Sequence, residues 1–503
     1  MDIKKAIDSE ISSIQKNPVH ITWTPYADYE FNLTIPSTVY PPREDTDLLA
    51  KYLIKIGQVE DKRMIEIGCG SGAISILASK LGWDVTACDI NPFAVAATQG
   101  NSKSNGIHSI KVVEGGVGPD SKTISNNKWY GTGKADLIVW NLPYLGEKQL
   151  EEGLIGPLED AALIDFSQKG KEGLSEHLRN TLTNNNKILK DEGVVLLLHS
   201  NNARGDLLQR KWRENGWATR TINSIELDNS ELLTLFATWK PWGGREITEL
   251  DTIDSTNKFV LNQNLIDGAL VVAENQTEGI GRSGNNWDEI SESFKGTWLL
   301  NTYKGEPHLL QMKAALASID SIAVLMHENI PSQCNLIPNS FFNKQIGLKW
   351  PNDILYRTRK LGGVLIQSIT KGNSQKYAIG IGINCGNIDQ INELQYSPSS
   401  LVEITEKNIN LKIYSQILDA CMSSLLEEKH VLPIYDNNTL QNIWFRLMRK
   451  SIEMGVYQLS NGILTKAIGV TDNGCLLIQE INGESTLPRE ISDMDSFTYK
   501  ITQ

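Results

Sequence analysis

The sequence predicts an α/β protein with two larger domains followed by a small β-rich one, and three observations carry that prediction. The chain has 503 residues, which is more than one hydrophobic core usually serves. Residues 64–78 read as a short apolar strand, a glycine-rich turn and a helix, a pattern typical of a parallel sheet covered by helices. Beyond residue 455 short apolar runs alternate with turns, and the turn at residues 472–474, Asp-Asn-Gly, predicts a β-hairpin.

The composition is that of a globular protein in a reducing compartment. Hydrophobic residues make up 40% and charged residues 21% of the chain, as in ordinary globular domains. No apolar run approaches the roughly 18 residues that a membrane span requires, and the polar N-terminus is unlike a signal peptide. The six cysteines form no Cys-x-x-Cys pair, so we expect neither a zinc site nor a disulfide framework. We therefore expect a cytoplasmic protein with no membrane partner, and the net charge of −12 opposes broad nucleic-acid binding.

Two changes in sequence pattern divide the chain. A Pro/Gly cluster at residues 240–245 follows an apolar strand and precedes a new start at Ile247. Between residues 440 and 455 the pattern changes again, from helical spacing to short strands with tight turns. The predicted domains are therefore 1–242, 247–445 and 446–503, the last of them a small β-barrel.

The first domain carries a glycine-rich turn suited to a nucleotide-like ligand. Gly68, Gly70 and Gly72 permit a tight turn and a close approach of the ligand to the backbone. Asp89 ends the following strand about twenty residues later, where a carboxylate can bind both hydroxyls of a ribose. Dinucleotide-binding folds have the same spacing, so the turn alone leaves both interpretations open.

A second motif, at the end of a buried strand, separates these interpretations. Residues 141–144 read Asn-Leu-Pro-Tyr, which resembles the Asn-Pro-Pro-Tyr motif of class I methyltransferases that alkylate a planar nitrogen. Residues 37–46 are similar to the Val-Tyr-x-Pro-x-Glu-Asp-Thr signature of the archaeal and eukaryotic HemK-like enzymes, which methylate the glutamine of class I release factors. The resemblance covers about residues 20–240 and implies a Rossmann-like class I methyltransferase domain that uses S-adenosylmethionine.

This resemblance implies a cofactor site and an acceptor site. The residues that bind S-adenosylmethionine would be Thr46, Glu66, Gly68, Gly70, Asp89 and Asn141. The methyl acceptor would contact Asn141, Leu142, Pro143 and Tyr144, with Asn141 as the catalytic residue that orients the acceptor nitrogen. Leu142 stands where the family has its first proline, and we expect a looser turn there. The aspartate that the family usually has after the third strand is absent, and only Glu114 lies nearby. Residues 145–180 also lack the glycine-rich stretch that is usual in the family.

Four segments of the second half gain meaning when they are taken together. Residues 251–257 predict a strand end and a helix start, and residues 271–287 predict a strand and a glycine-spaced loop without a Walker A motif. Residues 347–366 predict three strands joined by two turns, with Lys360 at the mouth of the last strand. A cation there could hold an anionic ligand, or it could belong to a solvated turn. Residues 378–385 add a strand whose glycines let a ligand press on the backbone.

In order and spacing these segments resemble the biotin protein ligases, over about residues 247–503. The resemblance implies an α+β catalytic domain like that of class II synthetases, a C-terminal SH3-like β-barrel, and biotin–[acetyl-CoA-carboxylase] ligase activity with ATP, Mg²⁺ and biotin. Lipoate ligases share the fold, and the Lys-Trp-Pro-Asn-Asp segment at 349–353 favours biotin. Only about ten residues separate the two domains, which leaves no room for a winged-helix repressor domain, so we expect no operator binding.

The resemblance also implies the residues of this second site. Arg282 and Lys360 would be the catalytic cations, because negative charge develops on phosphate and acyl oxygens. Biotin would be bound by Ser255, Thr256, Asn257, Gln276, Gly279, Ile280, Gly281, Arg282, Lys360 and Gly363. ATP would be bound by Trp287, Asn352, Asp353 and Asn384, with Mg²⁺ arriving with ATP rather than in a cage of protein ligands. Ile280 replaces the first loop arginine, and Ser283 and Asn285 replace further basic residues, which predicts weaker retention of the adenylate.

The expected partners follow from both resemblances. A biotin carboxyl carrier protein would accept biotin, and a class I release factor would accept the methyl group, with a small zinc-binding activator subunit as a further partner. Biotin ligases often dimerise through their central sheet, so a homodimer is one expected state. Two alternatives stay open for the first domain: a methyltransferase for DNA or another amino group, and a catalytically inactive scaffold.

Overall fold

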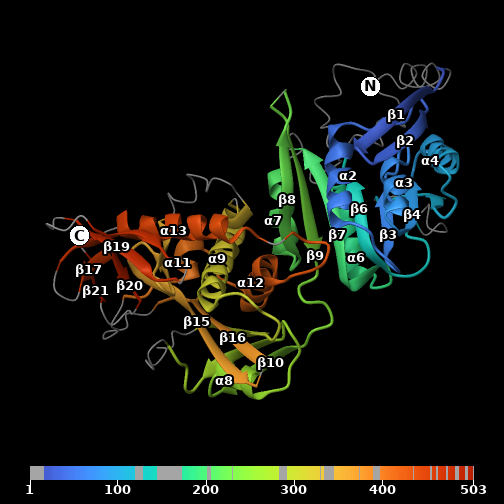
Figure 1. Cartoon of the computed structure of the whole chain (residues 1–503). Coiled ribbons are helices and arrows are strands. Elements are labelled where there is room, and N and C mark those ends of the chain that lie inside the picture. Colours follow the sequence, from blue (N-terminus) through green and yellow to red (C-terminus); the bar gives the residue numbers. More distant parts are fainter. Residues whose placement is uncertain are drawn as a thin grey trace. The chain divides into compact units, whose positions relative to one another are not determined.

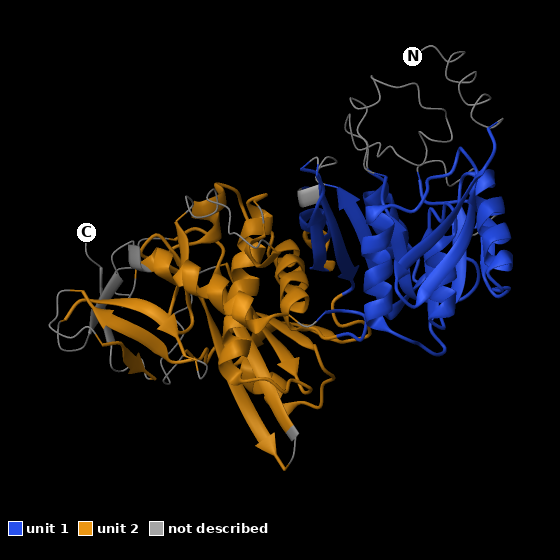
Figure 2. Ribbon diagram, turned by 45° about the horizontal axis from the view of Figure 1, so that its top comes forward, with its two compact units in different colours: residues 1–212, 219–240, 429–433 blue, residues 213–218, 241–428, 434–503 orange. Residues whose placement is uncertain are grey.

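The computed structural model divides the chain into two compact units (Figure 2). Unit 1 comprises residues 1–212, 219–240 and 429–433, and unit 2 comprises residues 213–218, 241–428 and 434–503. The structure describes residues 16–118, 129–143, 173–200, 205–228, 230–281, 292–328, 330–333, 345–372, 374–388, 397–433, 435–453, 456–459, 463–471, 474–481, 487–492 and 497–501.

Unit 1 is built on a seven-stranded sheet with the order β5-β4-β3-β6-β7-β9-β8 (Figure 1). Its strands are β3 (Arg63–Ile67), β4 (Asp84–Asp89), β5 (Lys111–Glu114), β6 (Ala135–Asn141), β7 (Leu189–Ser200), β8 (Ala218–Glu226) and β9 (Leu232–Trp239). The first five pair in parallel, and β9 is antiparallel to β7. The chain passes outward from β3 to β4 and β5 and returns to β6 on the other side of β3. Open α/β sheets bind ligands at such a switch point, beside the carboxyl ends of the strands.

The local sequence explains these elements. β3 and β6 are almost entirely buried and their residues are mostly apolar, as expected of strands covered on both faces. The helix that follows β4 begins after Asn91, whose Oδ1 accepts the Phe93 N–H, with Pro92 in the first turn. The described residues of this half of the chain contain the helices α2 (Glu44–Ile56), α3 (Ala73–Lys80), α4 (Pro92–Ser104), α6 (Leu174–Asn184) and α7 (Gly205–Glu214). A separate hairpin precedes them, formed by β1 (Val19–Tyr26) and β2 (Tyr29–Ile35).

Unit 2 contains a second seven-stranded sheet, with the order β10-β11-β12-β16-β15-β14-β13. Its strands are β10 (Ile247–Ile253), β11 (Leu270–Gln276), β12 (Ser293–Leu300), β13 (Ile346–Lys349), β14 (Asp353–Tyr356), β15 (Arg359–Lys371) and β16 (Ser374–Asn384). β10 and β11 are parallel, and the other pairs are antiparallel. The predicted strand-turn-strand-turn-strand pattern of residues 347–366 is therefore confirmed, together with the α/β class of the chain.

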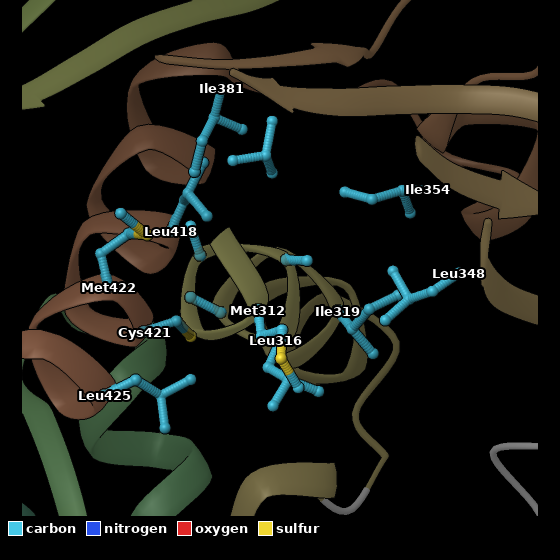
Figure 3. Close-up of a cluster of buried hydrophobic side chains, with 14 of the residues drawn as sticks. Met312, Leu316, Ile319, Leu348, Ile354, Ile381, Leu418, Cys421, Met422 and Leu425 are labelled. Atoms are coloured by element: carbon cyan, nitrogen blue, oxygen red, sulfur yellow. The ribbon is translucent and has the colours of Figure 1, made fainter. Parts of the chain in front are cut away.

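The core of unit 2 forms between this sheet and long helices. Figure 3 shows Met312, Leu316 and Ile319 of α9 between side chains of α12 and side chains of the sheet. All of the labelled side chains are buried, so burial of apolar area is the main stabilising term here. The helical elements in the described part of this unit are α8 (Thr256–Asn262), α9 (Pro307–Leu325), the 3-10 turn η4 (Pro331–Gln333), α11 (Leu401–Thr405), α12 (Leu411–Leu426) and α13 (Asn437–Glu453).

One helix among the described residues is long and apolar enough to cross a membrane. This helix is α9, although the sequence analysis found no such run. Its 18-residue window is 72% buried within the protein, and it carries the buried polar residues Lys313 and Asp320. The burial identifies α9 as a core helix, because the apolar face that a membrane would cover is already covered by protein.

The C-terminal strands form two small sheets. β18 (Thr465–Val470), β19 (Leu476–Glu480) and β20 (Arg489–Ile491) are antiparallel, and β17 (Val456–Leu459) pairs with β21 (Phe497–Ile501). The predicted hairpin between β18 and β19 is confirmed, with Thr471 and Cys475 paired across it. α13 continues through residue 446, where the third domain was predicted to begin. Closure of these strands into an SH3-like barrel stays a prediction.

Candidate functional sites

The glycine-rich turn after β3 brings its backbone to the carboxylate that ends β4. Gly68, Gly70 and Gly72 all have positive φ, at 70°, 53° and 83°, which explains why glycine is required. The Gly70 N–H donates to Asp89 Oδ2 at 3.0 Å, and the Asn91 N–H donates to Asp89 Oδ1 at 2.9 Å. The two predicted cofactor residues Gly70 and Asp89 therefore lie together at the switch point. Burial raises the pKa of Asp89, although these backbone N–H donors oppose the rise.

Glu66 lies beneath this turn and is almost fully buried. Burial raises the pKa of its carboxyl group to about 8, although the Ser75 hydroxyl donates to Glu66 Oε2 and opposes the rise. Asp89 raises the pKa further through charge repulsion. The two acidic side chains therefore provide a region in which a positively charged ligand would be favoured.

Asn141 ends β6 on the other side of the switch point. Its Nδ2 donates to Asp45 Oδ2 at 2.8 Å, while its Oδ1 is buried and has no hydrogen-bond partner among the described residues. Asp45 lies in the first turn of α2, next to the predicted cofactor residue Thr46. The tertiary structure thus connects the two sequence motifs, one before and one after the cofactor turn.

The turn after Asn141 differs from the expectation of a looser structure. Leu142 is buried, and its backbone N–H donates to Leu198 O at 2.9 Å. Proline has no N–H and could not form this bond. The leucine therefore anchors the turn to β7 and corrects the sequence-based expectation. Pro143 is the last described residue here, and the predicted Tyr144 lies outside the described residues.

The second site is organised around a carboxylate shared by two lysines. Asp353 begins β14, and its oxygens contact Lys349 Nζ at 2.6 Å and Lys360 Nζ at 2.8 Å. Lys349 and Asp353 are buried, whereas the Lys360 side chain is 27% exposed. Burial by itself raises the pKa of Asp353, but the two lysines outweigh burial, and the pKa lies below its usual value. Lys360 is therefore held in place and still reaches the surface.

The backbone of Lys360 is fixed from both sides. Its N–H donates to Ser397 O at 3.1 Å, and its carbonyl accepts from the Ser399 N–H at 2.8 Å. Asn384 Nδ2 donates to Lys360 O at 3.3 Å and to Ser399 O at 3.0 Å. The predicted nucleotide residue Asn384 thus positions the strand that carries Lys360.

Asn352 has a similar backbone-binding role. Its Nδ2 donates to Val364 O at 3.2 Å, and its carbonyl accepts from the Val364 N–H at 2.9 Å. These bonds hold the turn before β14 against β15. Gly363, predicted to bind biotin, lies on β15 and pairs with Asp353. Asn352 and Gly363 therefore lie beside the carboxylate that Lys349 and Lys360 share.

The start of α8 is tied to the end of β11. Ser255 is the residue before the helix and is buried. Gln276 Oε1 accepts from both the backbone N–H of Thr256 at 2.9 Å and its hydroxyl at 3.1 Å. Three of the predicted biotin-binding residues, Ser255, Thr256 and Gln276, are therefore brought together from positions some twenty residues apart.

The Asn257 side chain forms its hydrogen bonds with other residues of the protein. Its Oδ1 lies 2.6 Å from the Thr297 hydroxyl, and its Nδ2 donates to Gln367 Oε1 at 2.9 Å. Thr297 also lies 2.8 Å from the Thr256 hydroxyl. Because both ends of its amide have protein partners, Asn257 is better suited to holding α8 in place than to contacting biotin directly.

The predicted loop after β11 is described only at its beginning. Its base is fixed by backbone bonds from Thr277 and Glu278 to the end of β10. Gly279, Ile280 and Gly281 follow, whereas Arg282, Ser283, Asn285 and Trp287 lie outside the described residues.

Several residues that hold these sites together were assigned no role from the sequence. Asp45 and Lys349 lay inside the motifs, and a search for buried charge next to a predicted polar residue could have found them. Thr297 and Gln367 lie on β12 and β15 without any motif, and only strand pairing brings them to α8.

Two family models match the chain. Residues 46–143 match the Ribosomal protein L11 methyltransferase (PrmA) family, and residues 249–384 match the Biotin/lipoate A/B protein ligase family.

Individual relatives include proteins named for each of the two activities. A protein of Methanocaldococcus jannaschii named as a protein N5-glutamine methyltransferase is 32% identical over 203 residues, which cover 40% of this chain and 92% of that protein. A biotin–[acetyl-CoA-carboxylase] ligase of Paracoccus denitrificans is 26% identical over 244 residues, which cover 47% of this chain and 95% of that protein. A solved biotin protein ligase from Aquifex aeolicus, in complex with biotin and ATP, is 22% identical with a TM-score of 0.35, covering 51% of this chain and 99% of that one.

Proposed function

Since the chain joins an S-adenosylmethionine-dependent methyltransferase of the protein N5-glutamine methyltransferase family to a biotin protein ligase, we propose a specific chemistry for each site. The ligase site activates biotin with ATP at Lys360 and transfers it to a carrier lysine. The methyltransferase site methylates a protein glutamine held by Asn141. The observation that supports the ligase chemistry best is the ion pair of Lys360 with buried Asp353.

In the first ligase step, a carboxylate oxygen of biotin attacks the α-phosphorus of ATP. A new P–O bond forms, and pyrophosphate leaves with the electrons of the broken bond. Lys360 stabilises the negative charge that develops on the phosphate oxygens, because its Nζ is fixed before the reaction begins. Arg282 is the second cation of this proposal, and Mg²⁺ accompanies the triphosphate.

In the second step, the carrier lysine attacks the acyl carbon of biotinyl-5′-AMP, a C–N bond forms and AMP leaves. The attacking neutral amine loses one proton, which passes to solvent. Asp353 is suited to orienting this amine, because it is a buried carboxylate whose pKa is lowered and which stays charged at neutral pH. Ser255, Thr256 and Gln276 provide polar groups for the biotin ring, supported by the hydrogen bonds that join Gln276 at the end of β11 to the start of α8.

The ligase proposal is tested with ATP, biotin and a biotin carboxyl carrier protein. We expect Lys360→Ala to slow adenylate formation by about 100–1000-fold, the loss typical of one preorganised charge-stabilising donor. Lys371→Ala is a matched control, because Lys371 is an exposed lysine at the far end of the same strand. Equal labelling by wild type and Lys360→Ala would falsify the role given to Lys360.

For the methyltransferase site, Asn141 Oδ1, which has no partner within the part of the chain that the structure describes, supports an amide acceptor. A glutamine amide donates two hydrogens, and one of them can bind this oxygen. The amide nitrogen is a weak nucleophile, so orientation toward the sulfonium methyl is the main contribution that the site can make. The methyl group forms a bond to nitrogen, S-adenosylhomocysteine leaves, and one proton passes to solvent.

The acceptor is identified by offering the full chain a panel of substrates with labelled S-adenosylmethionine. We expect label on the glutamine of a class I release factor, with a small zinc-binding activator subunit required for full rate. Label on ribosomal protein L11 or on DNA, but not on the release factor, would replace this acceptor assignment. S-adenosylmethionine binding without label on any substrate would favour the inactive scaffold.

The proposal also covers the C-terminal fold, the cellular location and the oligomeric state. The C-terminal sheets form an SH3-like barrel, supported by the antiparallel order of β18, β19 and β20. The Trp350 indole N–H donates to Gly474 O at 3.2 Å, so this region contacts the segment that carries the ligase site. We also propose that the enzyme works in the cytoplasm, and that the ligase half forms a homodimer through its sheet.

A further inference from the structure

Asp45 presents an unusual set of contacts at the start of α2. It is 2% exposed, and Oδ1 accepts from the Thr46 backbone N–H at 2.6 Å and from the Thr46 hydroxyl at 3.1 Å. Its other oxygen, Oδ2, accepts from Asn141 Nδ2 at 2.8 Å. Each oxygen of the carboxylate therefore has a defined direction, one toward its own helix and one toward the proposed acceptor site.

An ionised carboxylate can accept hydrogen bonds but cannot donate them. Asn141 must therefore turn its NH₂ group toward Asp45, which leaves Oδ1 as the free end of the amide. This Oδ1 is buried and has no partner among the described residues. Without the carboxylate the amide could rotate by 180°, and an NH₂ group facing the amide of the substrate would repel it.

We propose that Asp45 is a positioning residue that fixes which end of the Asn141 amide faces the methyl acceptor. This inference rests on the proposed transfer to an amide nitrogen and adds the residue that sets its geometry. Leu142 supports the arrangement, because its N–H bond to Leu198 O fixes the backbone on the C-terminal side of Asn141. Asn141 is then held by its side chain from α2 and by the following peptide from β7.

The contacts of Thr46 predict what Asp45→Asn would do. The two Thr46 donors would keep the oxygen of the new amide at the position of Oδ1, because that position needs an acceptor. The new NH₂ group would then face Asn141 and require its oxygen. Asn141 would turn over and present NH₂ to the acceptor. An exchanged pair, Asp45→Asn with Asn141→Asp, would restore an oxygen at the acceptor position.

The test measures methyl transfer by the full chain to the glutamine of a class I release factor. We expect Asp45→Asn to lower kcat by about 100-fold, since misplaced orientation costs roughly that much. The Kd for S-adenosylmethionine should change much less than kcat, because Asn141 keeps its place and only the two ends of its amide exchange, and the exchanged pair should recover most of the lost kcat. Asp47→Asn is the control, because Asp47 lies two residues after Asp45 on the same helix and accepts a hydrogen bond from the Trp23 indole instead.

The outcomes separate this inference from the proposed function. Wild-type kcat in Asp45→Asn, or an exchanged pair no better than Asp45→Asn, would overturn it. If wild type methylates no amide, the proposed function fails, and the inference is then decided by the side-chain NH₂ signals of Asn141 in ¹⁵N-asparagine-labelled protein. The inference is supported if one NH₂ proton is protected from exchange in wild type and this protection is lost in Asp45→Asn. Unchanged protection refutes it.

Discussion

Asp353 forms ion pairs with two lysines, and these ion pairs keep its buried carboxylate charged. Lys349 Nζ and Lys360 Nζ contact different oxygens of the same group. Replacing one member of such a buried set usually costs more than the set contributes overall, because it leaves an uncompensated charge. Lys360 therefore depends on a neighbour that the sequence motif contained but did not distinguish. The motif predicted Lys360 as a catalytic cation, while only the structure revealed the second lysine beside it.

Glu66 leads to a prediction about pH. Its pKa of about 8 lies above the ordinary value of 4.5, so the ligand-free protein holds a proton on Glu66 at neutral pH. Its contribution to folding stability is fully present below pH 4.5 and is lost as pH rises toward 8. A ligand with positive charge favours the carboxylate and must expel this proton. We expect the affinity for S-adenosylmethionine to rise by up to about tenfold per pH unit between pH 6 and 7.5.

Calorimetry in buffers of different ionisation enthalpy checks this prediction by counting the protons released on binding. The range ends at about pH 7.5 because the α-amino group of the ligand itself titrates near 7.7–8.0. Glu66→Gln is the control, since its amide cannot release a proton. Equal pH dependence in wild type and Glu66→Gln would assign the effect to another group.

At the scale of elements, α8 is fixed by the strands on which it packs. Thr297 on β12 and Gln367 on β15 hold the two ends of the Asn257 amide. β16 passes so close that a Cβ at Gly380 would lie 2.4 Å from Asn257 Oδ1. The glycine-spaced strand was expected to accommodate a ligand. At Gly380 the structure gives a different reason for glycine, namely the close approach of α8.

We expect Gly380→Ala to displace Asn257 and to weaken biotin binding. The overpacking should lower the free energy of unfolding by about 1–3 kcal/mol, and the shift of α8 should reduce biotin affinity by more than the change in stability explains. Denaturant unfolding and biotin titration measure the two effects. Gly469→Ala is the control, because its Cβ would meet Leu477 at an ordinary 3.5 Å. Biotin affinity equal to that of wild type would contradict the role of α8.

At the scale of the whole molecule, the two units do not follow a single cut in the sequence. Unit 2 includes Arg213–Ala218, and unit 1 includes Lys429–Pro433. Within unit 2, Arg213 Nη1 contacts Asp320 Oδ2 at 3.0 Å, and both side chains are 0% exposed. Asp320 also accepts from the Ser332 backbone N–H at 3.1 Å. A buried pair with these additional bonds depends strongly on both of its members.

We expect Arg213→Met in the full chain to destabilise unit 2 by about 3–5 kcal/mol, because Asp320 would stay buried without its cation. Biotinylation should be lost at a lower temperature than in wild type, and S-adenosylmethionine binding should be less affected. The double variant Arg213→Met/Asp320→Asn should regain part of the loss, since asparagine removes the charge and still accepts from Ser332. Thermal inactivation that is unchanged in Arg213→Met would contradict this role.

The sequence by itself determined both families and most of the local structure. Glycines at positive φ, the turn at Asn352 and the β18–β19 hairpin follow from backbone preferences that act over a few residues. For that reason Gly68, Gly70, Asp89 and Lys360 could be singled out before any tertiary contact was known. Each of them lies inside a short motif in which residue type and local conformation are closely linked.

Only the tertiary structure decided which residues hold these groups in place. Asp45 reaches Asn141 across 96 positions of the chain, and Thr297 reaches Asn257 across 40. Contacts of this kind arise from strand order and helix packing, which no local pattern encodes. The replacement of proline by Leu142 shows the same limit: the sequence predicted a looser turn, whereas pairing with β7 supplied a bond that proline lacks. Local preferences select the reactive groups, and burial with long-range pairing fixes their orientation.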